Sequence, residues 1–342
     1  MRKRELKAMS MGLLLTPIFS LSAQNRLFKL VQTIPMPGVQ GRLDHFGLDV
    51  KGKRIFVAAL GDSQNTVEVL DLGSGKRVSS IPGQSKPQGI FYSAEFSKLF
   101  VANGDDGTCK IFRNDFKLIR SLPVGTDADH VGYDPTTKYL YVGIGDAKSG
   151  ALSVIDTRTN KHVWDIKTDA RPGGIKIEQA GGPRIFVTLA GSTKLGVVDK
   201  TKREEIMTFP ATNAGGSVAL ALDEGHHRLF AGVRNPPLLV ILDTESGRQI
   251  SQLEGVAGID DLWWDAARQR VYASGGRGFD VGYVYVYQQK DADHYELESK
   301  VATAPGAGTS LWASELDRLY VAAPASEKRG AAVLVLEPQK LK

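Results

Sequence analysis

The sequence predicts an all-β fold, a seven-bladed β-propeller built from four-stranded antiparallel blades. Three observations support this prediction: a short motif recurs seven times, four strand-like runs accompany it in most units, and the two ends of the chain supply one shared blade. The chain has 342 residues, 42% of them hydrophobic, which is enough for the core of one large all-β domain.

The recurring motif is a basic or polar residue followed by an aliphatic, an aromatic and a small apolar residue. It first appears as Arg54-Ile55-Phe56-Val57. The aromatic residue recurs at positions 56, 100, 141, 186, 230, 272 and 320, with spacings of 44, 41, 45, 44, 42 and 48. This period is typical of propeller blades with four strands each.

Turn residues divide each unit into short strand-like runs, which in the first unit are 45–50, 54–60, 66–72 and 76–81. We therefore expect blades at 44–82, 87–123, 128–168, 172–210, 216–254, 258–303 and 307–337. The third run often ends in an aspartate, which we interpret as turn structure because a short carboxylate accepts hydrogen bonds from turn amides. These aspartates are Asp71, Asp156, Asp199 and Asp243.

The seventh unit ends at its third strand, and the missing fourth strand is found at the other end of the chain. Residues 28–35 (FKLVQTIP) closely match residues 116–123 (FKLIRSLP), the end of the second unit. We expect the N-terminal strand to join the last blade and close the ring, which leaves no open sheet edge. An open solenoid or two β-sandwiches would leave this match unexplained.

The repeats resemble those of the YVTN/YncE-like β-propeller family over about residues 27–342. Residues 99–104 (LFVANG) are close to the motif that gives the family its name, whereas units such as 321–323 (VAA) lack the asparagine. The resemblance implies an exported propeller, and it carries over no catalytic residues.

Residues 1–23 resemble a signal peptide. A basic stretch precedes an apolar run at 11–21, and the small residues Ser20, Ser22 and Ala23 follow. The apolar run is about half the ~20 residues that span a bilayer, although an uncleaved anchor is the alternative. We expect a mature propeller domain at 24–342, periplasmic or secreted, monomeric and without a further membrane span.

Charge and cysteine content narrow the choice of function. The net charge is +5, of which residues 1–23 contribute +3, so the mature chain carries +2 and nucleic acid is not an expected partner. The single cysteine, Cys109, excludes an internal disulfide, and we expect it to be a half-buried structural thiol.

Candidate site residues are those that lead into the first strand of each blade, because these positions meet at the mouth of the channel. Three blades carry ionisable pairs there, and the others carry small, apolar or amide residues. The seven pairs are Asp44-His45, Gln88-Gly89, Asp129-His130, Gly173-Gly174, Val218-Ala219, Asp260-Asp261 and Gly308-Thr309.

The two Asp-His pairs occupy equivalent positions in alternate blades, so they could face each other across the mouth. Carboxylate and imidazole together are a common metal-ligand set and also a general-base set. Repeat duplication and simple turn capping are the alternative explanation. Because strand side chains alternate, we expect one residue of each pair to face the channel.

Further candidates surround these pairs. Arg42 could bind an anionic group, and Gln88 is a further ligand-binding candidate. Arg277 lies in the glycine-rich loop 274–282, which could cover a ligand or be a plain flexible loop. Gly-Asp loops between second and third strands contain Asp62, Asp105 and Asp146, whose oxygens would suit a hard cation such as calcium, unless they serve only the turns.

No nucleophile elbow, CxxC, zinc-protease or phosphate-loop motif occurs, so no residue is assigned a catalytic role. We therefore expect a binding or scaffold protein that holds a small molecule or an envelope protein on its channel face. The alternative is a metal-dependent hydrolase or lyase, similar in kind to lactonases, that uses the Asp-His pairs. A divalent metal ion is the cofactor that these residues would suit.

Overall fold

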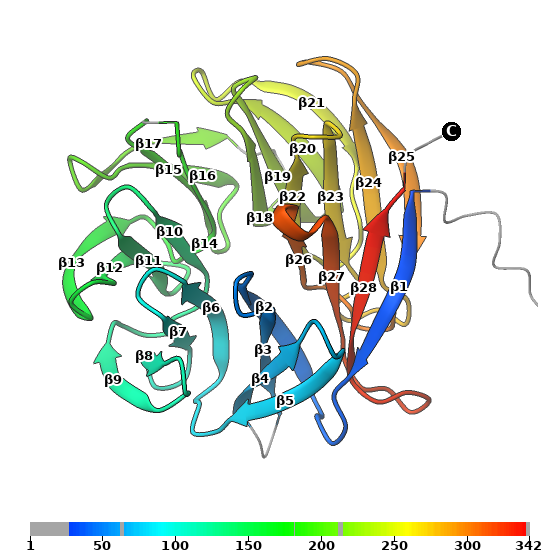
Figure 1. Ribbon diagram of the computed structural model, residues 1–342. Helices are drawn as coiled ribbons and strands as arrows, with labels where there is room; N and C mark the ends of the chain where they lie inside the picture. Colours follow the sequence, from blue (N-terminus) through cyan, green and yellow to red (C-terminus); the bar gives the residue numbers. More distant parts are fainter. Residues whose placement is uncertain (1–26, 62–64, 181, 211–214, 340–342) are drawn as a thin grey trace, which may run out of the picture.

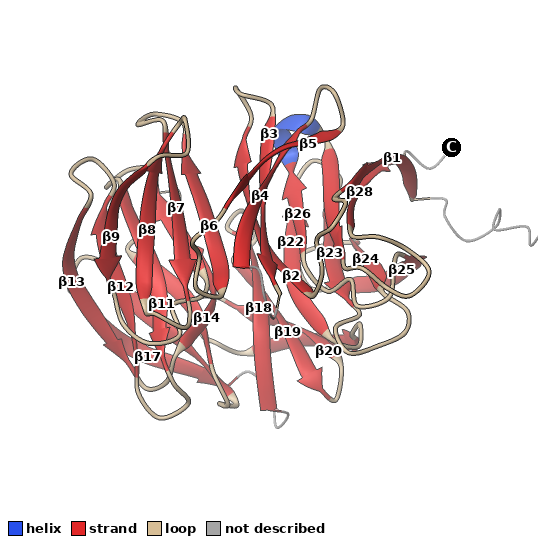
Figure 2. Ribbon diagram, turned by 90° about the horizontal axis from the view of Figure 1, so that it is seen from below, coloured by secondary structure: helices blue, strands red, loops and turns tan. Residues whose placement is uncertain are grey.

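The computed structural model describes residues 27–61, 65–180, 182–210 and 215–339. The expected signal peptide and the metal candidate Asp62 lie outside these residues. Seven four-stranded antiparallel sheets surround a central axis (Figure 1), which confirms the predicted propeller. Among the described residues the single helical element is a 3-10 turn, η1 (Ser314–Leu316), at one end of the ring (Figure 2).

The first four blades follow one another along the chain. Blade 1 contains β2 (Arg42–Asp49), β3 (Arg54–Leu60), β4 (Asn65–Asp71) and β5 (Lys76–Ile81). Blade 2 contains β6 (Pro87–Ser93), β7 (Lys98–Asn103), β8 (Thr108–Arg113) and β9 (Leu118–Pro123). Blade 3 contains β10 (Val131–Asp134), β11 (Tyr139–Gly145), β12 (Gly150–Asp156) and β13 (Lys161–Thr168). Blade 4 contains β14 (Pro172–Ile177), β15 (Arg184–Leu189), β16 (Lys194–Asp199) and β17 (Glu204–Pro210).

The last three blades complete the ring. Blade 5 contains β18 (Gly215–Asp223), β19 (Arg228–Asn235), β20 (Leu238–Asp243) and β21 (Gln249–Glu254). Blade 6 contains β22 (Ile259–Asp265), β23 (Arg270–Gly275), β24 (Tyr283–Gln289) and β25 (Tyr295–Ala302). Blade 7 contains β26 (Ser310–Ala313), β27 (Arg318–Ala323), β28 (Ala332–Pro338) and β1 (Phe28–Pro35).

The seventh blade joins the two ends of the chain, as predicted. β1 pairs antiparallel with β28, from Phe28 opposite Pro338 to Pro35 opposite Ala332. Figure 1 shows these two strands, blue and red, side by side.

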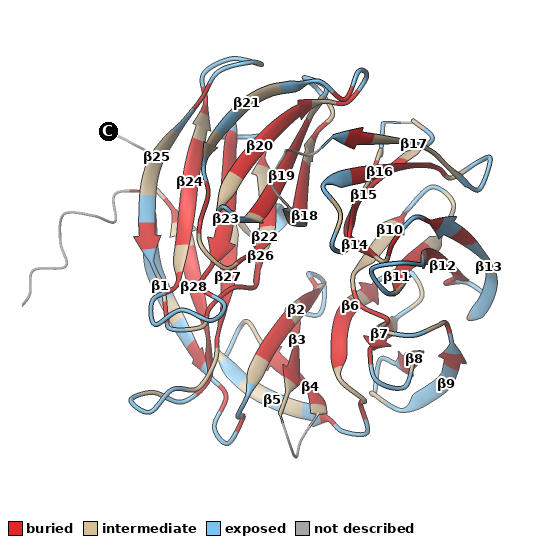
Figure 3. Cartoon of the chain, turned by 180° about the vertical axis from the view of Figure 1, so that it is seen from behind, coloured by how far each residue is buried: buried red, intermediate tan, exposed pale blue. Residues whose placement is uncertain are grey.

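The core lies between neighbouring blades. The seven repeat aromatics all lie on second strands, each at most 3% exposed. Phe56, for example, packs with Ile90 and Leu99 of the next blade. Burial decreases from the inner strands to the outermost strand of each blade (Figure 3).

The aspartates at the ends of third strands bind turn amides, as interpreted from the sequence. The Oδ1 atom of Asp199 accepts hydrogen bonds from the backbone N–H groups of Thr201 at 2.8 Å and Lys202 at 2.9 Å. The hydroxyl of Thr201 and these amides hold the pKa of Asp199 below its usual value. Asp71, Asp156 and Asp243 bind turn amides in the same way.

Cys109 is fully buried rather than half-buried, and this burial raises its pKa to about 12. In the described part of the chain, no helix has the length and apolar character needed to cross a bilayer.

Candidate functional site

The residues that lead into the first strands line a cavity of about 110 Å³ at the mouth of the channel. All seven blades contribute to its wall. Its polar lining consists of His45, His130, Lys176, Asp260, Asp261 and Ser310.

A second cavity of about 590 Å³ follows farther along the channel, toward the ends of the first strands. The two cavities share several wall residues and are therefore consecutive sections of one channel. The shared residues are Phe46, Ile90, Val131, Ile175, Lys176, Trp263 and Leu311.

Irregular pairing re-aims the side chains at the mouth. In blades 1, 2, 4, 5 and 6 the register between the first and second strands shifts where the predicted pairs lie. A β-bulge breaks the alternation of side chains and can turn two consecutive residues toward one site. Asp260 and Asp261 both line the cavity, so the expectation of one channel-facing residue per pair is wrong for this blade.

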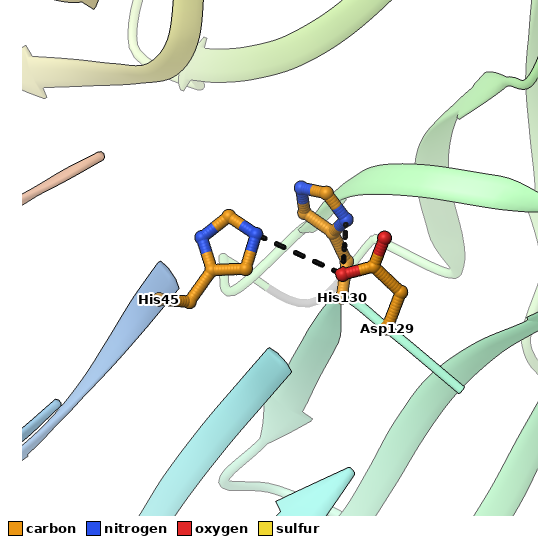
Figure 4. Close-up of side chains that lie close together, drawn as sticks. All are labelled: His45, Asp129 and His130. Carbon is orange, nitrogen blue, oxygen red and sulfur yellow. Dashed lines mark ion pairs between the residues drawn. The ribbon is translucent and has the colours of Figure 1, made fainter. Parts of the chain in front are cut away.

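His45, Asp129 and His130 form the centre of the site (Figure 4). The two imidazole rings, from blades 1 and 3, have centroids 4.3 Å apart. Asp129 Oδ1 lies 3.4 Å from His130 Nδ1 and 3.9 Å from His45 Nε2. These separations are too long for good hydrogen bonds, so the three groups face a common point without binding one another tightly.

Hydrogen bonds from neighbouring residues fix the carboxylates of Asp129 and Asp261. Arg171, which leads into blade 4, donates a hydrogen bond of 2.8 Å to Asp129 Oδ2. The backbone N–H of Ser310 donates one of 2.8 Å to Asp261 Oδ2, and Asp261 Oδ1 lies 3.6 Å from His45 Nδ1.

Two polar atoms at the centre lack a partner. Asp129 Oδ1 and His130 Nδ1 are buried without a hydrogen bond to any described residue. Unsatisfied buried polar atoms are rare and costly, and they often mark where a ligand or ion binds.

The electrostatics of the site favour a positive charge between the carboxylates. Burial alone would lower the pKa of His45, but Asp44, Asp261 and Asp129 together raise it to about 10. Burial would raise the pKa of Asp129, yet His130, His45 and Arg171 hold it well below its usual range. The anionic groups around His45 therefore stabilise a cation there, whether a proton or a metal ion.

The three central residues fit a metal ion by chemistry and by spacing. Their ligand atoms lie within 4.8 Å of one another. Zinc bonds of 2.0–2.1 Å in a tetrahedron place neighbouring ligand atoms about 3.4 Å apart. The Asp129–His130 pair has this spacing at 3.4 Å, and His45 Nε2 lies only slightly farther from Asp129 Oδ1, at 3.9 Å.

The other ligand-binding candidates predicted from the sequence lie around the central cluster and bind neighbouring groups. Asp44 is buried and pairs with Arg42, and burial raises the pKa of Asp44. Gln88 is buried and donates a hydrogen bond of 3.2 Å to the carbonyl of Ala128. Arg277 lies 3.7 Å from Asp260.

The structure does not bring the described Gly-Asp loops into the central cluster. Asp146 Oδ1 accepts hydrogen bonds from the backbone N–H groups of Lys148 at 2.7 Å and Ser149 at 3.0 Å, which is turn structure. Asp105 is exposed.

Two residues of the site were missed in the sequence. Arg234, at the end of β19, pairs with Asp260. Lys176 projects into the channel from β14. The sequence could have identified Lys176, because the six residues equivalent to it in the other blades are uncharged. These are Gly47, Phe91, Gly132, Ala221, Trp263 and Leu311, each paired with a repeat aromatic as Lys176 is with Phe186.

Gly89 allows blades 2 and 3 to approach each other closely. A Cβ atom there would lie 2.1 Å from the carbonyl oxygen of Asp129 and 2.8 Å from Val131 Cγ1. We expect Gly89→Ala to lower the free energy of unfolding by about 1–3 kcal/mol, because the backbone of Asp129, next to β10, cannot move away without disturbing the packing. Chemical denaturation measures this, with Gly330→Ala, where a Cβ meets nothing, as the control. Equal stability of the two variants would contradict the close approach.

Comparisons with known proteins support the fold and nothing more specific. No protein-family model and no curated protein matches the chain. It is similar to a chain in a crystal structure of the mitotic checkpoint complex, with 14% identity, a TM-score of 0.74, and coverage of 99% of this chain and 100% of that one. Hydrazine synthase from Kuenenia stuttgartiensis has 16% identity and a TM-score of 0.70, with 87% and 98% covered. The WD40 repeats of RRP9 have 13% identity and a TM-score of 0.70, with 92% and 98% covered.

Proposed function

We propose that this propeller binds a small molecule at the mouth of its channel, together with a divalent metal ion held by His45, Asp129 and His130. The observation that carries the proposal is the convergence of three ligand atoms within 4.8 Å at the head of a cavity. Two of the atoms, Asp129 Oδ1 and His130 Nδ1, have no other partner among the described residues.

Zn²⁺ is the ion that two imidazoles and one carboxylate suit best. Asp261 would orient His45, because a carboxylate that accepts the Nδ1 proton leaves the Nε2 lone pair free for the metal. Asp261 Oδ1 lies 3.6 Å from Nδ1, and Ser310 fixes the position of the same carboxylate. Arg171 would orient Asp129 in the same way, because it donates a hydrogen bond to Oδ2 and leaves Oδ1 for the metal.

A three-ligand zinc site leaves a coordination position for water or a ligand. The protein is thus proposed as a binding protein whose ligand occupies the cavity beside the metal. A metal-dependent hydrolase or lyase is the second candidate, which the same open position favours.

Export, family and assembly are part of the proposal. Residues 1–23 support a signal peptide and a periplasmic or secreted mature chain of 24–342, and the repeat motif supports a YVTN/YncE-like propeller. We propose that this chain is a monomer whose partner is a small molecule or an envelope protein.

The first test is the melting temperature of residues 24–342 in chelator and then with zinc, manganese, magnesium or calcium. A ligand at about 100 times its Kd stabilises the folded state by about 2.7 kcal/mol, which is a shift of a few degrees. We expect zinc to give the largest shift. Unchanged melting with every ion would refute the metal site and, with it, the second candidate.

A further inference from the structure

Lys176 has no ion-pair partner in the channel. Among the described residues its ammonium forms no ion pair with a carboxylate, and it sits 4.7 Å from the ring centroid of Trp263. Its side chain lines both sections of the channel. Burial lowers the pKa of Lys176, opposed only by the charge of Asp261.

The fold does not require a lysine at this position. Six of the seven equivalent positions are glycine, alanine, leucine or an aromatic residue, and their blades pack in the same way. Desolvating a charge without a partner is unfavourable, so an apolar residue would stabilise the fold more. A residue that costs stability at a cavity is characteristic of a binding site.

Two further cations neutralise part of the negative charge at the mouth. Two guanidiniums, those of Arg234 and Arg277, surround the single carboxylate of Asp260. They offset the charge of Asp260, which leaves Lys176 and the carboxylate of Asp261 as the opposed charges on the cavity wall, and Lys176 is the group there that attracts an anionic ligand. The section at the mouth, of about 110 Å³, is the smaller of the two described sections of the channel and suits a compact ligand.

We propose that Lys176 binds the carboxylate or phosphate group of a small anion, which lies between Lys176 and the His45–Asp129–His130 cluster. This inference rests on the proposed function and specifies the class of its ligand. The ammonium of Lys176 lies over the ring of Trp263, and both residues line the cavity.

The experiment titrates zinc-loaded protein with acetate, succinate and inorganic phosphate, and with acetamide and succinamide as neutral counterparts, by calorimetry. We expect at least one anion to bind 10-fold or more tightly than its neutral counterpart, because a charged hydrogen bond is lost in the amide. Phosphate has no such counterpart, so it is compared with acetamide. Binding of carboxylates alone or of phosphate alone identifies the preferred group.

Variants of Lys176 separate this inference from the metal site. Lys176→Met should remove the preference for anions, keep zinc affinity within about 2-fold and raise the melting temperature of the ligand-free protein. Lys176→Arg should keep the preference. The exposed Lys51 provides the control, and Lys51→Met should behave as wild type.

The inference is overturned if zinc binds but no anion is preferred, which leaves the proposed function intact. It is also overturned if Lys176→Met melts lower and binds anions as well as wild type, because Lys176 is then a packing partner of Trp263. A different result, the failure of wild-type protein to bind zinc, would refute the proposed function.

Discussion

Replacing both imidazoles, His45→Ala with His130→Ala, is expected to lower zinc affinity by more than about 1,000-fold. Loss of a single outer-shell partner of a metal ligand typically costs 10–100-fold, so loss of two direct ligands costs more. Calorimetric titration of residues 24–342 with zinc measures the effect. Because both histidines are only partly buried, the variant should keep the melting temperature of the chelator-treated wild type within a few degrees.

The matched control removes two imidazoles from elsewhere on the surface. His226 and His294 each pair with a nearby aspartate, Asp223 and Asp291, and neither lines the channel. His226→Ala with His294→Ala should bind zinc as wild type does. Equal losses in both double variants would show that zinc binds to surface histidines, and the channel site would be rejected.

Removing β1 is expected to abolish cooperative folding. β1 is the outermost strand of blade 7, and it buries Phe28 and Ile34, each at most 1% exposed, with Met36 just after it. Each buried side chain of this size contributes about 1.5–3 kcal/mol, so their sum approaches the whole stability of a typical protein. The loss also exposes the edge of β28 to pairing with other chains.

Thermal melting and light scattering compare chains that begin at residues 24, 27 and 37. The first two should melt cooperatively and alike, whereas the third should aggregate or lack a transition. Ile34→Ala provides a milder variant, expected to cost about 2–5 kcal/mol in full-length protein. Cooperative melting of the chain beginning at 37, with an unaffected Ile34→Ala, would mean that β1 does not close the ring.

The ring closure and the number of blades could be predicted because they depend on local patterns. A repeat near 44 residues and an aromatic at a constant place in it describe one blade, and identical blades bury their faces only against one another. The match between residues 28–35 and 116–123 placed β1 beside β28 before any contact was visible. Turn aspartates such as Asp199 were interpretable for the same reason, since their partners are two and three residues away.

The site could be predicted only as far as the repeat alignment reaches. Alignment placed His45 and His130 at equivalent positions of alternate blades, and the structure brings their rings to 4.3 Å. Lys176 lies opposite a repeat aromatic, Phe186, and not among the residues that lead into the first strands, so the alignment of those residues gave it no role. The Gly-Asp loops also suggested Asp105 and Asp146 as metal candidates, and the structure leaves both outside the central cluster.

Sequence by itself therefore determined the propeller, its closure and the end of the channel where charged residues gather. Only the tertiary structure decided which of those residues meet: bulges turn both Asp260 and Asp261 inward, Gly89 allows Asp129 to approach, and Arg171 leaves one oxygen of Asp129 free. The physical reason is the sequence separation over which the interactions act. Strand pattern and turns are set within one repeat, whereas the geometry of the site depends on side chains from separate blades that only the closed ring brings together.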